Sequence, residues 1–209
     1  MVKGIHKAAC PVNGMTRGTV VRFTPDFSCF EKGAAFDLER LKKRLELSGY
    51  LNSGCRILLN LNGEATDYTQ TGGIVALLEK EIVVAEAEAI IRAPVVVDSN
   101  GIHMALTWVN SGDEWVTSYV NSAQTIDGGV HVAGLNSALL DALKPYKGSR
   151  TYSASDLRSG MFCIVNVNVK EPLFTSQTKE ELRGSQLSDV KADVYAALKP
   201  ALDEFFSKN

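Results

Sequence analysis

Three consecutive strand-like segments, at residues 94–98, 102–109 and 114–121, constrain the fold of this chain most strongly. In the second segment the residues His, Ala, Thr and Val alternate with Met, Leu and Trp, which is the period of two expected of a β-strand. Asn100-Gly101 and Ser111-Gly112-Asp113 separate consecutive segments, and both are typical of hairpin turns. We therefore expect a meander in which each strand pairs with the next.

Helical periodicity surrounds these strands. The expected helices lie at residues 37–49, 73–79, 129–144 and 185–206. Apolar residues recur on one face of the first, third and fourth of these helices, as Leu38, Leu41 and Leu45 do in the first, which is the spacing of an amphipathic helix. Pro200 is expected to kink or interrupt the last helix. Further strands are expected at residues 18–23, 56–61 and 161–169. This order predicts an α+β fold with a sheet covered on one face.

Composition excludes several classes of protein. The 209 residues are 45% hydrophobic and 22% charged, with a formal net charge of -2, so no global positive field indicates nucleic-acid binding. The cysteines at positions 10, 29, 55 and 163 have no paired spacing, which favours reduced thiols over a zinc site. No apolar run is long and uncharged enough to cross a membrane. A cytoplasmic protein without bound metal is expected.

Most residues capable of catalysis have simpler interpretations. The chain lacks a Gly-Lys-Ser/Thr phosphate loop, a nucleophile elbow and a His-Glu-x-x-His motif. Cys163 lies within an apolar segment, where a buried and inert thiol is expected. His131 lies near a helix start, where a structural hydrogen-bonding role is favoured and a catalytic role is the alternative.

The polar segment at residues 170–184 has a different character. Gln177-Thr178-Lys179 follows the end of a strand and contains no apolar anchor of its own. A lysine ammonium and a glutamine amide two residues apart can reach the same phosphate. From these residues alone, a phosphate-binding loop and an ordinary polar loop are both possible.

Several short motifs occur in a fixed order along the chain. They are Gly18-Thr19-Val20-Val21-Arg22-Phe23-Thr24-Pro25-Asp26, Thr71-Gly72-Gly73-Ile74, Asp127-Gly128-Gly129-Val130-His131, Asp156-Leu157-Arg158-Ser159-Gly160-Met161 and Ser176-Gln177-Thr178-Lys179. This ordered set resembles the B subunit of type IIA DNA topoisomerases over nearly the whole chain. The resemblance implies a C-terminal segment of a GHKL-type ATPase domain at residues 1–62. It also implies a transducer domain similar to the second domain of ribosomal protein S5 at residues 63–209.

The resemblance implies specific roles for four residues. Lys179 matches the lysine that contacts the terminal phosphate of ATP, and Gln177 matches its neighbour in that loop. Thr19 matches the threonine at the adenine end of the nucleotide pocket, and Val21 matches a residue that lines it. The complete enzyme of this family uses ATP and Mg²⁺ and acts on DNA together with an A-type subunit. Its B subunits form a homodimer when ATP binds.

The chain also departs from the family pattern. The general-base glutamate, the magnesium asparagine and the glycine-rich lid of the family all precede the matched region. An isolated chain is therefore expected to bind no nucleotide and to be inactive. Val130 replaces a threonine after the paired glycines. Asn136 stands where gyrases commonly carry an arginine that faces the DNA cavity.

Two alternative functions remain open at the level of sequence. One is a GHKL ATPase of the MutL type, which shares the two-domain plan but lacks the Gln-Thr-Lys triplet. The other is a free-standing S5-like module that binds nucleic acid without ATP. The function implied by the resemblance is instead that of an ATP sensor. It would transmit the state of the nucleotide to the DNA gate of a topoisomerase located at the nucleoid.

Overall fold

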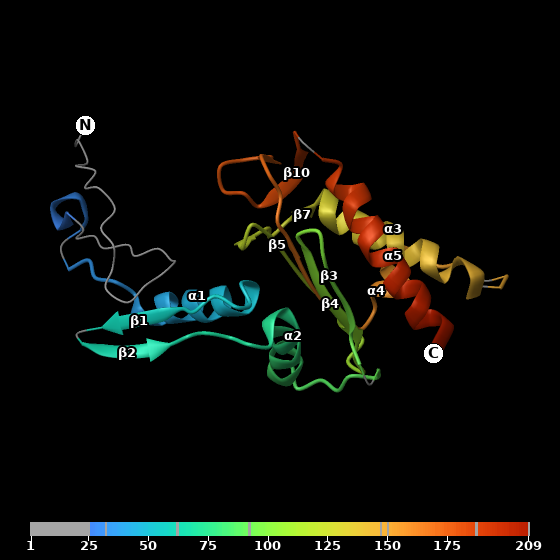
Figure 1. The fold of residues 1–209 in the computed structure, drawn as a ribbon, viewed down its shortest axis with the longest axis horizontal. Helices are drawn as coiled ribbons and strands as arrows, with labels where there is room; N and C mark the ends of the chain where they lie inside the picture. The colour runs from blue at the N-terminus through green and yellow to red at the C-terminus, as the bar shows by residue number, and fades with distance from the viewer. Residues whose placement is uncertain are drawn as a thin grey trace. The chain divides into compact units, whose positions relative to one another are not determined.

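The computed structural model describes residues 26–31, 33–61, 63–91, 93–146, 148–149, 151–186 and 188–208 (Figure 1). The backbone divides into two compact units, Met1–Leu38 and Glu39–Asn209. In its described part the first unit contains a short 3-10 helix, η1 (Phe27–Cys29). Asp26 starts this helix by accepting hydrogen bonds from the backbone and hydroxyl of Ser28. The strand expected at residues 18–23 lies outside the described residues.

A five-stranded sheet forms the centre of the second unit. Its strands are β3 (Val95–Ser99), β4 (Ile102–Trp108), β5 (Trp115–Val120), β6 (Ala123–Gln124) and β8 (Met161–Val167). They are ordered β3-β4-β8-β5-β6 across the sheet. The central strand β8 runs antiparallel to β4 and parallel to β5. All seven residues of β8 are buried, as expected of a strand with a neighbour on each side.

The expected pairing of the second and third strand segments is wrong. β3 and β4 form the antiparallel hairpin predicted at Asn100-Gly101. β4 and β5, however, are separated in the sheet by β8. Gly112 still turns the chain with a φ of 75°, but the strand that pairs with β4 comes from much later in the sequence. Turn residues determine where a chain reverses and leave the hydrogen-bonding partner of each strand open.

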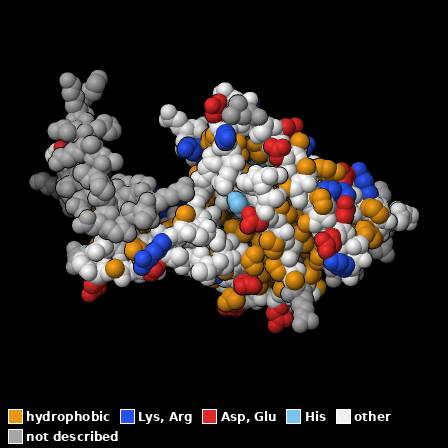
Figure 2. Space-filling view, in the orientation of Figure 1, with side chains coloured by type: hydrophobic (Ala, Val, Ile, Leu, Met, Phe, Trp, Pro, Cys, Tyr) orange, Lys and Arg blue, Asp and Glu red, His pale blue; other side chains and the backbone are white. Residues whose placement is uncertain are grey.

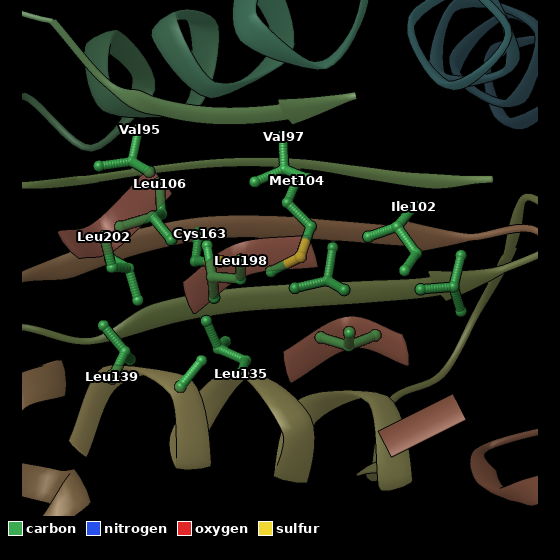
Figure 3. Close-up of a cluster of buried hydrophobic side chains, with 14 of the residues drawn as sticks. Val95, Val97, Ile102, Met104, Leu106, Leu135, Leu139, Cys163, Leu198 and Leu202 are labelled. Carbon is green, nitrogen blue, oxygen red and sulfur yellow. The ribbon is translucent and has the colours of Figure 1, made fainter. Parts of the chain in front are cut away.

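Two long helices cover one face of the sheet. They are α3 (Val130–Leu143) and α5 (Val190–Lys208). Leu135 and Leu139 of α3 and Leu198 of α5 are fully buried against strand side chains such as Met104 (Figure 3). Burying one leucine side chain contributes about 1.5–3 kcal/mol. This cluster is the main hydrophobic core of the second unit.

The opposite face of the sheet is also covered, so the expectation of a single covered face is wrong. Helices α1 (Leu38–Leu51) and α2 (Gly73–Val84) supply Leu51, Leu77 and Leu78 to a second buried cluster. The sheet contributes alternate residues to this cluster, including Ala105 and Ile164. Side chains that alternate along a strand point to opposite faces. The same strands therefore supply both clusters.

The last helix differs from its prediction at two points. It begins at Val190 rather than 185, because the carboxylate of Asp189 accepts a hydrogen bond from the Ala192 backbone at 3.1 Å and so caps the first turn. Pro200 lies inside α5 without interrupting it. Leu198 and Leu202, on either side of the proline, are both fully buried. Packing on the core therefore holds both halves of the helix in line.

The remaining elements are short. A two-stranded hairpin consists of β1 (Leu58–Leu61) and β2 (Glu64–Asp67), and only β1 was expected as a strand. Between α3 and β8 lie η2 (Lys144–Tyr146) and α4 (Ala154–Arg158). A separate three-stranded sheet consists of β7 (Gly128–Gly129), β9 (Pro172–Phe174) and β10 (Glu181–Ser185), in the order β7-β10-β9. None of the helices in the described ranges has the length and apolar composition needed to cross a membrane.

Strand β7 (Gly128–Gly129) joins the small sheet to the start of α3. Gly129 has a φ of 132° and a ψ of -156°, a backbone conformation open essentially to glycine only. It pairs with Leu182 of the parallel strand β10. A Cβ at position 129 would overlap the carbonyl oxygen of Leu182 and lie 2.7 Å from its nitrogen. Only glycine therefore permits this approach of the two backbones.

Replacing Gly129 with alanine should lower the free energy of unfolding by about 3 kcal/mol or more, because strain and overlap add. The measurement is urea unfolding followed by circular dichroism. Gly112→Ala is the matched control, since Gly112 has a φ of 75° and nothing within 4 Å of an added Cβ. Its cost should be only about 1–2 kcal/mol. Equal losses in the two variants would contradict the role of the close backbone approach.

Candidate functional site

The segment with the Gln-Thr-Lys triplet is the tip of a β-hairpin. Strands β9 (Pro172–Phe174) and β10 (Glu181–Ser185) pair antiparallel, with Phe174 opposite Leu182. Neither strand was expected from the sequence. Leu182 is fully buried, so the apolar anchors of the tip lie in the strands on either side of it.

Hydrogen bonds within the tip close it into a compact turn. The Thr175 backbone nitrogen donates to the Glu181 carbonyl at 3.2 Å, and the Lys179 nitrogen donates to the Ser176 carbonyl at 3.2 Å. The hydroxyls of Ser176 and Thr178 are 2.6 Å apart. These bonds lie within the hairpin, so its exposed polar side chains are displayed by an ordered backbone.

Lys179 and Gln177 are both exposed at this tip. Lys179 has a φ of 61°, which is uncommon for a residue with a side chain. Its ammonium lies over the ring of Phe174, with Nζ 5.8 Å from the ring centroid. The tip therefore combines a cation and a neutral amide donor, the two groups expected to reach one phosphate.

The base of the hairpin is attached to the start of α3. The Asp127 nitrogen donates to the Glu180 carbonyl at 2.9 Å, immediately after Lys179. Two residues further on, Leu182 pairs with Gly129 in the parallel bridge between β10 and β7. A continuous set of backbone bonds thus runs from the tip to the N-terminus of α3.

The other two predicted site residues, Thr19 and Val21, lie outside the described residues. The roles of all four residues remain predictions.

His131 is buried in the first turn of α3. It is fully inaccessible, and its Nε2 lies 3.2 Å from the hydroxyl of Thr125. That hydroxyl is 2.7 Å from the hydroxyl of Ser118, which also donates to the Thr125 carbonyl at 3.1 Å. Burial lowers the pKa of His131 to about 4. These contacts support the structural interpretation of His131 over the catalytic one.

One arrangement of protons satisfies this buried chain. Ser118 donates to the Thr125 carbonyl, so the Thr125 hydroxyl is left to donate to Ser118 Oγ. Nε2 of His131 then carries the ring proton and donates to Thr125. Nδ1 of His131, which has no hydrogen-bond partner among the described residues, becomes the unprotonated nitrogen. A buried lone pair without a partner costs less than a buried N–H without one.

Asn136 on α3 is bonded to a neighbouring arginine. The Arg158 guanidinium donates to the Asn136 side-chain oxygen at 2.9 Å and forms an ion pair with Glu114 at 2.7 Å. Arg158 lies at the end of α4. A cation is therefore held beside position 136, but a carboxylate partly neutralises it. No pattern in the sequence indicated this contact, because the three residues are far apart along the chain.

A second polar group was also missed from the sequence. His103 Nδ1 lies 2.8 Å from Asp98 Oδ1, and its Nε2 lies 3.2 Å from the Asn168 amide. These residues line a cavity of about 370 Å³ between β3, β4 and the start of α2. The β3–β4 hairpin explains the first contact, since Asp98 pairs directly with His103.

Metal ligands and reactive thiols do not gather in the described part of the chain. No group of three or more His, Cys, Asp or Glu residues is placed to hold a metal ion there. Cys163 is buried in β8, and burial raises the pKa of its thiol, as expected of an inert cysteine. Basic and acidic side chains are interspersed over the face shown in Figure 2.

Solved structures of related proteins share this fold. The B-subunit of the DNA gyrase from Myxococcus xanthus is 25% identical, with a TM-score of 0.76 over 95% of this chain and 60% of that chain. The topoisomerase IV ATP-binding domain of Francisella tularensis is 25% identical, with a TM-score of 0.68 over 87% of this chain and 51% of that one. These neighbours confirm the predicted fold class. The fold is that of the B-type subunits of type IIA DNA topoisomerases.

The sequence of the chain shows which family it belongs to. The family model described as DNA gyrase B matches residues 65–209, so the chain belongs to the DNA gyrase B family. The gyrase B protein of Cytophaga aurantiaca is 31% identical over 92% of this chain and 43% of its own length. The gyrase B protein of Thermotoga maritima is 30% identical over 92% of this chain and 32% of its own length. The chain spans less than half the length of these relatives.

Lowering the pH from 7 to 4 should destabilise the fold through His131. Its pKa is about 4 in the folded protein against 6.5 in the unfolded chain, so the unfolded state binds the proton first. The contribution of neutral His131 to the free energy of unfolding is complete above the unfolded pKa. It is lost as the pH falls towards 4, which lowers the free energy of unfolding by about 3 kcal/mol. Urea unfolding at a series of pH values measures this loss.

His131→Gln replaces the ring N–H with an amide donor and removes the titration, so it should flatten the dependence of the unfolding free energy on pH across this window. The carboxyl group of Asp156, whose pKa is lowered from 3.8 by hydrogen bonds from Ser153, titrates below the window. An unchanged slope in His131→Gln would contradict the assignment.

Proposed function

We propose that this chain is part of an ATP-dependent type II DNA topoisomerase and that its β9–β10 hairpin senses bound ATP. The observation that carries the proposal is the exposed pair of Lys179 and Gln177 on an ordered hairpin tip, in a chain of the DNA gyrase B family. Membership of that family favours this function over the MutL-type alternative.

Lys179 would act on the terminal phosphate by electrostatics. Its ammonium is a compact cation on a flexible stem, suited to stabilising negative charge that develops on a phosphate as its bond breaks. Gln177 would add a neutral donor from the same tip. Because the backbone of the tip is hydrogen-bonded, both groups would reach the phosphate without ordering the loop first.

The donors of the hairpin fit a phosphate, but they form only one side of a nucleotide site. We propose that Thr19 and Val21 line the adenine end of that site. Hydrolysis of ATP would release the free energy that the enzyme uses. A Mg²⁺ ion bound with the nucleotide would neutralise part of the phosphate charge. Residues beyond those of this hairpin would hold the metal ion.

The connection from β10 to β7 supports a route for transmission. A phosphate that draws Lys179 would pull on β10, and Leu182 of β10 is paired with Gly129 at the start of α3. Helix α3 packs on α5 and on the central sheet. A small displacement of the tip would therefore move helix α3 rather than a flexible segment. A signal to the DNA gate would need such a rigid connection.

The proposed function implies a division into domains and a set of partners. We propose that residues 1–62 belong to the end of a GHKL ATPase domain and that residues 63–209 form a transducer domain. In the complete protein the partners would be DNA, an A-type topoisomerase subunit and a second copy of the B-type protein, with which it dimerises when ATP binds. Such an enzyme would act in the cytoplasm at the nucleoid.

Lys179→Ala in the complete protein should lower the rate of ATP hydrolysis by about 100-fold or more, the effect of removing one group that stabilises a transition-state charge. Nucleotide binding, measured with a fluorescent ATP analogue, should change little. Lys170→Ala is the matched control, because Lys170 is exposed at the base of the hairpin. Normal turnover in Lys179→Ala would refute the role of this lysine.

The purified 209-residue chain should hydrolyse no ATP above the buffer background, since the hairpin supplies only part of a nucleotide site. A coupled assay with the complete protein as positive control makes the comparison. Clear turnover that co-purifies with the chain would show that the whole catalytic site lies within it.

A further inference from the structure

The contact between Lys179 and Phe174 connects the exposed tip of the hairpin to the protein core. Phe174 is the last residue of β9, and it lies opposite the buried Leu182. It is partly buried and packs against the main hydrophobic cluster. One part of the ring is therefore held by the core. The Lys179 ammonium lies over this ring, 5.8 Å from its centroid.

Other groups near the tip do not explain the position of the ammonium. Glu180 and Glu181 follow Lys179 in the sequence, yet within the described ranges no carboxylate forms an ion pair with it. The aromatic face is the group that contacts the cation. An ammonium is attracted to the negative face of an aromatic ring at this separation.

The backbone of the tip favours the same contact. The turn closed by the Lys179–Ser176 hydrogen bond and the φ of 61° at Lys179 bring the side chain back towards the end of β9. A lysine has many rotamers in solution, and restricting them before a ligand arrives lowers the cost of binding or catalysis.

We propose that Phe174 is a positioning residue for Lys179. Its ring holds the ammonium on one side of the hairpin, so that the lysine is ordered before it meets a phosphate. This role rests on the proposed function of Lys179 and adds a residue to it. It also makes the core of the second unit, through Phe174, part of the phosphate-sensing site.

The contact can be measured in the 209-residue chain by nuclear magnetic resonance. Protons over an aromatic face are shifted upfield, so the ε-methylene protons of Lys179 should resonate upfield of those of the exposed Lys170. They should also show nuclear Overhauser effects to the Phe174 ring. Phe174→Leu should abolish the shift, and Phe174→Tyr should keep it. The same shift in wild type and Phe174→Leu would overturn the proposal.

The consequence for hydrolysis is measured in the complete protein. Phe174→Leu keeps an apolar side chain for the core and removes the ring, so kcat should fall about two- to fivefold while KM for ATP is unchanged. Phe174→Tyr should restore kcat. Leu173→Ala is the matched control, because Leu173 is the adjacent β9 residue and is 43% exposed.

The sensing function of Lys179 and the positioning role of Phe174 can be tested separately. If Lys179→Ala abolishes hydrolysis and Phe174→Leu leaves kcat unchanged, the positioning role is overturned and the sensing function stands. If Lys179→Ala hydrolyses ATP normally, the sensing function is overturned and the positioning role with it, even where the resonance shift is present. An equal fall of kcat in Phe174→Leu and Leu173→Ala, with equal losses in thermal unfolding, would also overturn the positioning role.

Discussion

The approach of the Gly129 backbone to Leu182 is the constraint on which the site depends. It is made by two chain segments that are distant in sequence, and a single methyl group would prevent it. On one side of this joint the hairpin displays an ammonium and an amide. On the other side α3 begins and enters the main core. The contact between Gly129 and Leu182 therefore fixes the exposed hairpin to the start of a helix that is packed in the core.

The buried hydrogen-bond chain holds the start of α3, directly after Gly129, against the central sheet. Ser118 belongs to the central sheet, Thr125 follows β6, and His131 belongs to the first turn of α3. A neutral imidazole suits this position, since an imidazolium would be a buried charge that no carboxylate of the described residues pairs with. Its structural role explains why a histidine near a conspicuous glycine pair can be unrelated to the chemistry.

Much of the fold could be predicted from local pattern, because the apolar stripes of α3 and α5 reflect burial directly and the period of two in β4 reflects its extended backbone. The predicted stripe of α1 was less informative, since Leu38 and Leu41 are exposed. The position of β8 between β4 and β5 could not, because turn sequences carry no information about a strand that enters the sheet from far along the chain. At the site, the polar triplet was evident from composition and resemblance. The contact of Lys179 with Phe174 was not, because it depends on a hairpin whose short strands have no periodic signal.

The central place of β8 also governs the order in which this protein can fold. During synthesis β4 and β5 emerge first. One edge of each strand stays unpaired until Met161–Val167 has left the ribosome. Pairings between segments far apart in the chain form slowly, and unpaired strand edges are prone to aggregation. The hairpin that carries Lys179 is made directly after the strand that completes the sheet. A nascent chain therefore exposes the hairpin that carries Lys179 only once the sheet that supports it can close.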